Sequence, residues 1–303
     1  MAVILMYHRI SDEFVEPNWL AVSPCHFAQH LEHIRQQYHP IRLLELVDAI
    51  QNGSLRERAV AVTFDDGYSN NFTQALPLLE AAQIPATVFV TTGHIDSSCE
   101  FWWDDLAHLL LGAAHTPATL SLKVQERFYT WDTESVQQRQ EARLALEDLI
   151  EPLPAKAKEQ VLYELANWSG LKRGGRSAYR AMTKAELTQL AQSKYIDLGA
   201  HTVTHPILPT LSPEEQYAEI VNGRRNLETL VNQPVRTFAY PNGDFASETV
   251  KIVAEAGFTA ACTTVRGCVQ AGDDLFRLRR YSVDDWSSAT FQQNLAAFFQ
   301  NQS

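Results

Sequence analysis

Short runs of apolar, β-branched and aromatic residues alternate along this 303-residue chain with longer stretches of helical pattern. The runs are mostly apolar throughout, which predicts strands covered on both faces, as in parallel sheets. Parallel neighbours need crossover connections, and the helical stretches supply them. The chain therefore predicts an α/β fold. The expected strands are Val3–Tyr7, Val60–Phe64, Ala86–Thr91, Ile196–Ala200, Thr237–Tyr240 and Thr259–Thr263.

Helix start and stop signals lie between these runs. Ser23 before Pro24 is typical of a helix start, because serine caps free N–H groups and proline fits the first turn. Serine or threonine three residues before glutamate forms a capping box, and glycine ends a helix in the left-handed conformation. Helices are therefore expected to begin at Thr183 with Glu186 and at Ser212 with Glu215, and one over about 247–256 to end at Gly257.

The segment from 101 to 180 breaks the alternation. Its pattern is helical from about Phe101 to Ala166, and a glycine-rich loop from Gly170 to Ser177 follows. We expect one domain over residues 1–303 with a helical insertion at about 101–180. The insertion opens with Phe101, Trp102 and Trp103, which either anchor it by packing or form a wall for a sugar ring. The dominance of large aromatics in core burial favours anchoring.

The charge balance limits the partners of this chain. Lysine and arginine total 25 and aspartate and glutamate 36, which gives a net charge of −11. A general nucleic-acid binder needs clustered cations to contact phosphates, so no nucleic-acid partner is expected. We interpret the tight basic cluster as a solvated loop; it consists of Lys172, Arg173, Arg176 and Arg180.

Targeting signals and cysteine usage favour a cytoplasmic location. No apolar run reaches about 18 residues, so no transmembrane helix is expected. The first residues, MAVILMYHRI, lack the charged start and cleavage site of a signal peptide. The cysteines at 25, 99, 262 and 268 form no close pair typical of zinc or redox sites, and we interpret them as free thiols. A pairing of Cys262 with Cys268 is left open, as is the oligomeric state.

Two acidic residues directly follow an expected strand. Asp65 and Asp66 come after Phe64, and Gly67 supplies a turn. In parallel α/β folds the C-terminal ends of the strands line the active site. Adjacent like charges at a buried edge are costly unless a cation or a proton relieves them. The pair therefore indicates either a functional site or an ordinary polar turn.

Two histidines follow another expected strand, at His201 and His205. The residues between them and the following Pro206 disfavour a helix, so we expect a tight loop that brings both imidazoles to one ion. Two histidines and a carboxylate leave open positions on a divalent ion, as catalytic sites require. A second group is expected on the flank of one helix without an acid nearby, and a metal role is not favoured there; it consists of His26, His30 and His33.

Together the two motifs resemble the polysaccharide deacetylase family, the NodB-homology domain of carbohydrate esterase family four. The motifs are Thr63-Phe64-Asp65-Asp66-Gly67 and His201-Thr202-Val203-Thr204-His205, and the resemblance covers roughly residues 1–95 and 195–290. It implies a distorted (β/α) barrel of about seven parallel strands. It also implies a hydrolase that removes acetyl groups from N-acetylated sugars of a polysaccharide or its precursor with a divalent metal, most often zinc.

By position, the resemblance makes Asp65 the general base and Asp66, His201 and His205 the metal ligands. Elementary chemistry agrees, because a metal can polarise an amide carbonyl and its bound water while a free carboxylate takes the water's proton. Two rival functions remain: an O-acetyl sugar esterase on the same site, and a catalytically inactive carbohydrate-binding domain. The identity and length of the sugar are not specified by the sequence.

The third family motif departs from its common form, Arg-Pro-Pro-Tyr. This chain has Ala239-Tyr240-Pro241-Asn242-Gly243 instead. The resemblance makes the backbone N–H of Asn242 an oxyanion donor. Tyr240, Pro241 and Trp286 are expected to contact the substrate. Because the motif arginine is missing, Arg280 is a candidate to fix the base; the alternative is an ordinary ion pair.

The position of the general acid is the second departure from the common family pattern. Most family members carry it in a C-terminal Leu-x-His motif, but no histidine follows His205 here. Some members carry a permuted Tyr-His element at the first strand, and Tyr7-His8 matches it. We therefore expect His8 to be the proton donor, with His94 as the rival.

Overall fold

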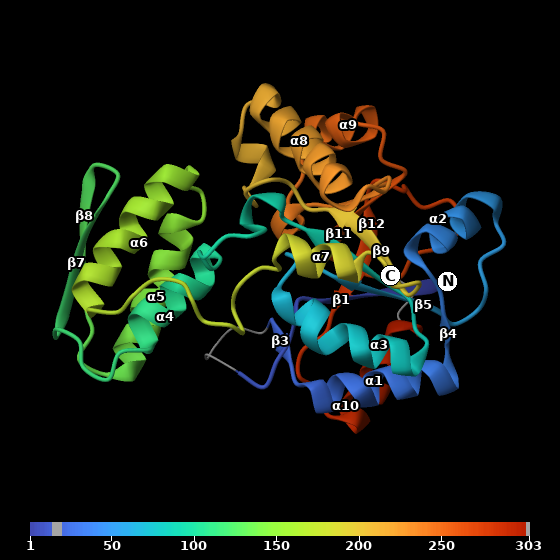
Figure 1. The fold of residues 1–303 in the computed structure, drawn as a ribbon, viewed down its shortest axis with the longest axis horizontal. Helices are drawn as coiled ribbons and strands as arrows, with labels where there is room; N and C mark the ends of the chain where they lie inside the picture. Colours follow the sequence, from blue (N-terminus) through green and yellow to red (C-terminus); the bar gives the residue numbers. More distant parts are fainter. Residues whose placement is uncertain (14–19, 301–303) are drawn as a thin grey trace. The chain divides into compact units, whose positions relative to one another are not determined.

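Seven parallel strands close into a barrel in the structure, a computed structural model that describes residues 1–13 and 20–300 (Figure 1). Each strand pairs in parallel with the next, and β1 pairs with β5 to close the ring. The expected barrel of about seven parallel strands is thus confirmed. In ring order the strands are β1 (Ala2–Tyr7), β12 (Leu278–Ser282), β11 (Ala260–Arg266), β10 (Thr237–Ala239), β9 (Ile196–Ala200), β6 (Ala86–Val90) and β5 (Ala59–Phe64).

Strand β12 was missing from the strands expected from the sequence. It reads Leu-Arg-Arg-Tyr-Ser, which is not an apolar run, yet Arg280 at its centre is fully buried. Three shorter strands lie beside the barrel strands or pair with one another. β4 (His39–Pro40) pairs with the start of β5, and β2 (Arg9–Ile10) pairs with β3 (Ala21–Val22).

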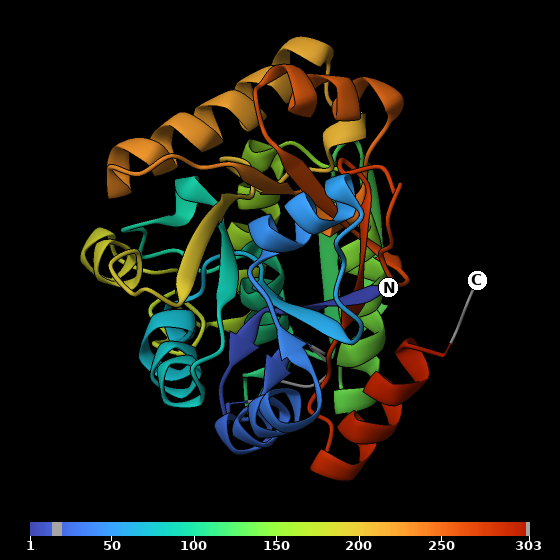
Figure 2. The same cartoon turned by 90° about the vertical axis from the view of Figure 1, so that its right-hand side faces the viewer.

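Helices surround the barrel strands, and Figure 2 shows α8 and α9 across from α1 (blue) and α10 (red). The expected serine cap and both capping boxes are present at Ser23, Thr183 and Ser212, and Gly257 is left-handed at φ 81°. None of the helices in the described part of the chain has the length and hydropathy needed to span a bilayer. These helices are α1 (Pro24–Gln37), α2 (Leu43–Asn52), α3 (Leu76–Ala82), α7 (Lys184–Leu190), α8 (Pro213–Val231), α9 (Ser247–Glu255) and α10 (Ser288–Phe298).

Short turns of other helical types link several elements, namely η1 (Asn71–Ala75), η2 (Thr92–His94), η3 (Leu208–Thr210) and η4 (Pro241–Gly243). All four cysteines are free thiols. Cys262 and Cys268 therefore do not pair, and the Cys268 sulfur lies 3.0 Å from the carbonyl of Phe298.

Successive residues of a strand point to opposite faces, so the strands contribute to two apolar cores, one outside the barrel beneath the helices and one in its interior. Val3, Leu5 and Tyr7 of β1 pack with the helices, whereas Ala2 and Ile4 face the barrel interior, which α2 covers at one end. The same alternation operates in the other strands. Interior residues include Ala59 and Ala61 of β5, Ala239 of β10, Cys262 of β11 and Leu278 of β12.

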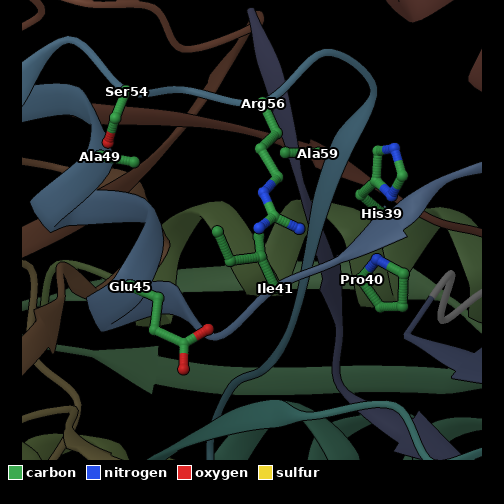
Figure 3. A pocket seen from close by; sticks show the side chains of 8 residues that line it. All are labelled: His39, Pro40, Ile41, Glu45, Ala49, Ser54, Arg56 and Ala59. Atoms are coloured by element: carbon green, nitrogen blue, oxygen red, sulfur yellow. The ribbon is translucent and has the colours of Figure 1, made fainter.

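A pocket of about 280 Å³ opens beside the start of β5. Figure 3 shows the Arg56 side chain extending into it, with Glu45 of α2 and His39 of β4 among the lining residues. Ala59, the first residue of β5, also lines it. The pocket therefore lies at the opposite end of β5 from Asp65 and Asp66, away from the strand ends where the sequence motifs lie.

Residues 97–181 form a second compact unit with its own apolar core. It contains α4 (Trp102–Leu111), α5 (Val136–Ile150) and α6 (Ala155–Ser169) (Figure 1). The expectation of helix throughout this segment was wrong over 119–132, where β7 (Thr119–Val124) and β8 (Arg127–Asp132) form an antiparallel hairpin. The reason is the alternation in β7, where Leu120, Leu122 and Val124 are buried and their neighbours exposed.

The basic cluster is not a solvated loop, because two of its arginines neutralise buried acids of this unit. Arg176 Nε donates to the fully buried Glu100 carboxylate at 2.9 Å, and Arg173 Nε donates to Asp105 at 2.9 Å. Desolvation otherwise makes a buried carboxylate expensive. The pairs therefore tie the glycine-rich loop to the start of α4.

The aromatic residues that open the insertion pack within this second unit. Phe101 and Trp103 are buried and their rings stack with centroids 4.8 Å apart. The Lys158 ammonium lies over the Trp102 ring at 4.7 Å. This packing favours a structural role for these residues over a wall for a sugar ring.

Replacing Arg176 tests the ion pair with Glu100. Arg176→Met should destabilise this unit by about 3–5 kcal/mol, because it leaves a buried carboxylate without its partner. Lys172→Met, at an exposed position of the same loop, is the control and should change stability by less than about 0.5 kcal/mol. Urea unfolding followed by tryptophan fluorescence measures both; equal midpoints for the two variants would contradict the assignment.

Candidate functional site

The sequence motifs meet at the C-terminal ends of the barrel strands. His8 follows β1, Asp65 follows β5 and His201 follows β9. Each continues the alternation of its strand on the interior side, since Tyr7, Phe64 and Ala200 belong to the outer core. The backbone N–H of Asp65 still donates to the Tyr7 carbonyl at 3.0 Å, so the pairing of β1 and β5 extends to the site.

Asp66, His201 and His205 form a buried cluster whose ligand atoms all lie within 4.8 Å of one another. The Asp66 Oδ1 atom lies 3.5 Å from Nε2 of His201 and 3.5 Å from Nε2 of His205. Donor atoms bound at about 2.0–2.2 Å to one tetrahedral ion lie roughly 3.4 Å apart. The three residues could therefore hold a single divalent metal.

Electrostatics and hydrogen bonding prepare this cluster for a cation. The Nδ1 of His201 lies 2.7 Å from the carbonyl of Ala239, so Nδ1–H donates and Nε2 presents a lone pair. Burial opposes ionisation of Asp66, but the nearby imidazoles of His201 and His205 hold the pKa of Asp66 well below its usual range. The carboxylate is therefore ionised at neutral pH.

The two histidines lie in a tight loop, as expected, and not on a helix. Thr202 and His205 adopt left-handed backbone conformations with φ of 65° and 58°. Each costs about 1–3 kcal/mol for a residue other than glycine. The Thr202 hydroxyl accepts a hydrogen bond from the N–H of His205 at 3.0 Å, which closes the loop on itself.

Asp65 forms a bidentate ion pair with Arg280. The NH1 and NH2 atoms of Arg280 donate to the two carboxylate oxygens at 2.7 Å each, and both side chains are buried. Burial raises the pKa of Asp65, but the charge and hydrogen bonds of Arg280 outweigh it, so the pKa lies below its usual value. Arg280 also donates to Thr63 Oγ1 and the Thr263 carbonyl, which fixes the guanidinium.

His8 lies close enough to Asp65 and Asp66 for their charges to affect its pKa. Burial lowers the pKa of His8, while the charges of Asp66 and Asp65 act in the opposite direction. Its own carbonyl accepts a hydrogen bond from Asn71 at 2.7 Å, which holds the end of β1. The rival His94 ends η2, after β6.

The third motif forms η4, a short turn that follows β10. Asn242 is exposed with φ 56°, and its carbonyl accepts a hydrogen bond from Thr264 at 3.0 Å. Substrate contact by Tyr240 stays a prediction; its side chain is fully buried, away from the barrel interior, and donates to the Phe276 carbonyl. The alternation of β10 is the reason, because Ala239 faces the interior and Tyr240 therefore faces the outer core. Pro241 is buried as well.

Trp286 lies against α1, the helix that carries the second histidine group. The Trp286 carbonyl lies 2.8 Å from His30 Nε2, and its ring packs near Phe298. The expectation of a flank without an acid was wrong, because His30 is fully buried and Asp285 lies 2.7 Å from His26 Nδ1. Burial lowers the pKa of His30 to about 4, so it is a neutral core histidine.

One residue near the site gave no signal in the sequence. Glu219 lies on α8 and hydrogen-bonds the loop between His201 and His205. No motif or spacing distinguishes it from the other acids of that helix.

Comparison with known proteins identifies the family. The polysaccharide deacetylase family model matches residues 52–261, and the chain belongs to this family. It is 21% identical over 289 residues to the putative polysaccharide deacetylase YxkH of Bacillus subtilis, covering 95% of this chain and 73% of that protein. It is 31% identical over 86 residues to the poly-β-1,6-N-acetyl-D-glucosamine N-deacetylase of Escherichia coli, but this covers 28% of this chain and only 13% of that protein.

Solved structures share the fold. The structure of IcaB from Ammonifex degensii has a TM-score of 0.64 with 19% identity, covering 99% of this chain and 97% of that chain. The Streptococcus pyogenes deacetylase PplD, solved in complex with acetate, has a TM-score of 0.60 with 22% identity and covers 97% of both chains.

A double-mutant cycle tests the Asp65–Arg280 pair. Asp65→Asn and Arg280→Met should each destabilise the protein by about 3 kcal/mol, because each leaves a buried group unpaired. The double variant should be more stable than the sum predicts, by on the order of 2 kcal/mol. Arg279→Met, at a half-exposed position of the same strand, is the control. Purely additive losses in urea unfolding would show that the two residues do not depend on each other.

Proposed function

We propose that this protein is a metal-dependent hydrolase that removes acetyl groups from N-acetylated sugars of a polysaccharide or its precursor. The observation that carries the proposal is the buried Asp66–His201–His205 cluster beside a separate, arginine-bound aspartate. Zinc is the metal that we expect, because two imidazoles and a carboxylate with room for further ligands suit it. When bound there, it supplies Lewis acidity toward a carbonyl and lowers the pKa of water.

Asp65 is the proposed general base. Arg280 occupies both carboxylate oxygens from one side, which keeps Asp65 ionised and separate from the metal ligands. Each carboxylate oxygen has more than one lone-pair site, so one remains to accept a proton from the attacking water. Arg280 is thus a positioning residue for the base, in place of the arginine missing from the third motif.

Two further residues complete the proposed machinery. The backbone N–H of Asn242 would donate to the oxyanion of the tetrahedral intermediate. His8, which directly follows β1, would donate a proton to the departing amine. Substrate contacts of Tyr240, Pro241 and Trp286 stay predictions.

The substrate class rests on the relatives. Their names include a polysaccharide deacetylase and an N-deacetylase of poly-β-1,6-N-acetyl-D-glucosamine. An N-acetylated glycan is therefore the proposed substrate, while O-acetyl esters use the same site chemistry and are the alternative. The cytoplasmic location and the inclusion of residues 97–181 in a single functional domain also stay predictions.

The two neighbouring aspartates provide the test of the proposal. Asp65→Asn should keep stoichiometric zinc and lose acetate release from N-acetylated glucosamine oligomers by roughly 10²–10⁴-fold, as for loss of a general base. Asp66→Asn, His201→Ala and His205→Ala should lose zinc and activity together. Elemental analysis and acetate assays on folded protein measure these effects. Full zinc content in both histidine variants would reject the metal site, and zinc-loaded wild type without activity on N- or O-acetylated glycans would favour an inactive binding domain.

The proton-donor role of His8 depends on the leaving group. His8→Ala should retain zinc and lose kcat by about 10²-fold on an amide substrate, because the amine leaves poorly without a proton. An activated acetyl ester, whose leaving group needs no proton, should be affected much less. His94→Ala is the matched control. Undiminished amide hydrolysis by His8→Ala would remove His8 from the mechanism and redirect attention to His94.

A further inference from the structure

Glu219 of α8 binds the loop that carries both histidines. Its Oε2 accepts hydrogen bonds from the backbone N–H groups of Val203 and Thr204 at 2.9 Å each. Its Oε1 accepts a hydrogen bond from the Thr204 hydroxyl at 2.8 Å. One carboxylate therefore makes three contacts with the two residues in the middle of the loop.

The loop receives hydrogen bonds from its other side as well. The N–H groups of Thr92 and Gly93 in η2 donate to the carbonyls of Thr202 and Val203 at 3.2 and 2.8 Å. Glu219 thus accepts hydrogen bonds from the N–H groups of the loop, while η2 donates hydrogen bonds to the carbonyls of the loop. Since the loop belongs to neither a helix nor a strand, these neighbours replace the hydrogen bonds that regular structure would provide.

Gly223, one turn after Glu219 on α8, lets the helix approach the loop between His201 and His205 closely. A Cβ atom at Gly223 would lie 2.8 Å from the carbonyl carbon of Thr202 and 2.9 Å from its oxygen. The helix backbone therefore packs directly on the backbone of the loop. Glu219, four residues earlier, lies on the same face and reaches the loop from a rigid support.

We propose that Glu219 is a positioning residue of the metal centre, which sets the separation and direction of His201 and His205 and thereby the affinity for the metal. This inference rests on the proposed metal site. Thr202 and His205 hold left-handed conformations that an unrestrained chain would leave. Ligand atoms that must first be ordered bind a metal less tightly, because the entropy of ordering opposes binding.

Zinc affinity of Glu219 variants tests the inference. Glu219→Ala should raise the zinc Kd by about tenfold or more, the size of effect typical for residues that orient metal ligands. Glu219→Gln should stay within about threefold, since its amide oxygen can accept both N–H groups. Glu214→Ala is the matched control, because Glu214 is an exposed acid of the same helix. Competition with a chromophoric chelator measures Kd, and the lost acetate release of Glu219→Ala should return in excess zinc.

The outcomes separate this inference from the proposed function. If His201→Ala weakens zinc binding and Glu219→Ala does not, the role of Glu219 is overturned and the metal site stands. If wild type and His201→Ala bind zinc alike, the metal site itself is rejected, and the inference with it. If Glu219→Ala does not fold, Glu219→Asp replaces it, because the shorter side chain cannot keep all three contacts; an unchanged Kd there would equally overturn the role.

Discussion

The ion pair of Asp65 with Arg280 is the interaction on which the site depends. Two charges inside a barrel are tolerable only because each neutralises the other and their hydrogen bonds are satisfied. The pair joins the end of β5 to β12 across the interior. It also gives the two neighbouring aspartates different surroundings, since Asp65 is bound by a guanidinium while Asp66 faces two imidazoles.

Several residues of the site hold strained backbone conformations. Among the described residues other than glycine, nine have a positive φ, and four of these lie in the site: Asp66, Thr202, His205 and Asn242. Such conformations persist only where neighbouring contacts enforce them. Here the enforcing contacts come from the strand ends, from η2 and from α8, which together hold the loops in the orientation that brings Asp66 and the histidines together.

The strand alternation explains on which side of the barrel wall each candidate side chain lies. His201 and Asp65 directly follow their strands and extend them on the interior side. Tyr240 also follows a strand directly, but its side chain points to the outside of the barrel and belongs to the outer core. The sequence alone did not give the side on which each residue lies, because β10 is buried on both faces.

The sequence by itself determined the α/β class, six of the seven barrel strands, the helix caps and the two motifs that identify the family, because all of these are local patterns of residue type. The tertiary structure decided the rest. Strand β12, the partner of Asp65 and the contacts of Glu219 depend on residues distant in the chain. A buried arginine looks like a surface residue until its carboxylate is located, since the cost of burying a charge is offset only by a partner that folding brings to it.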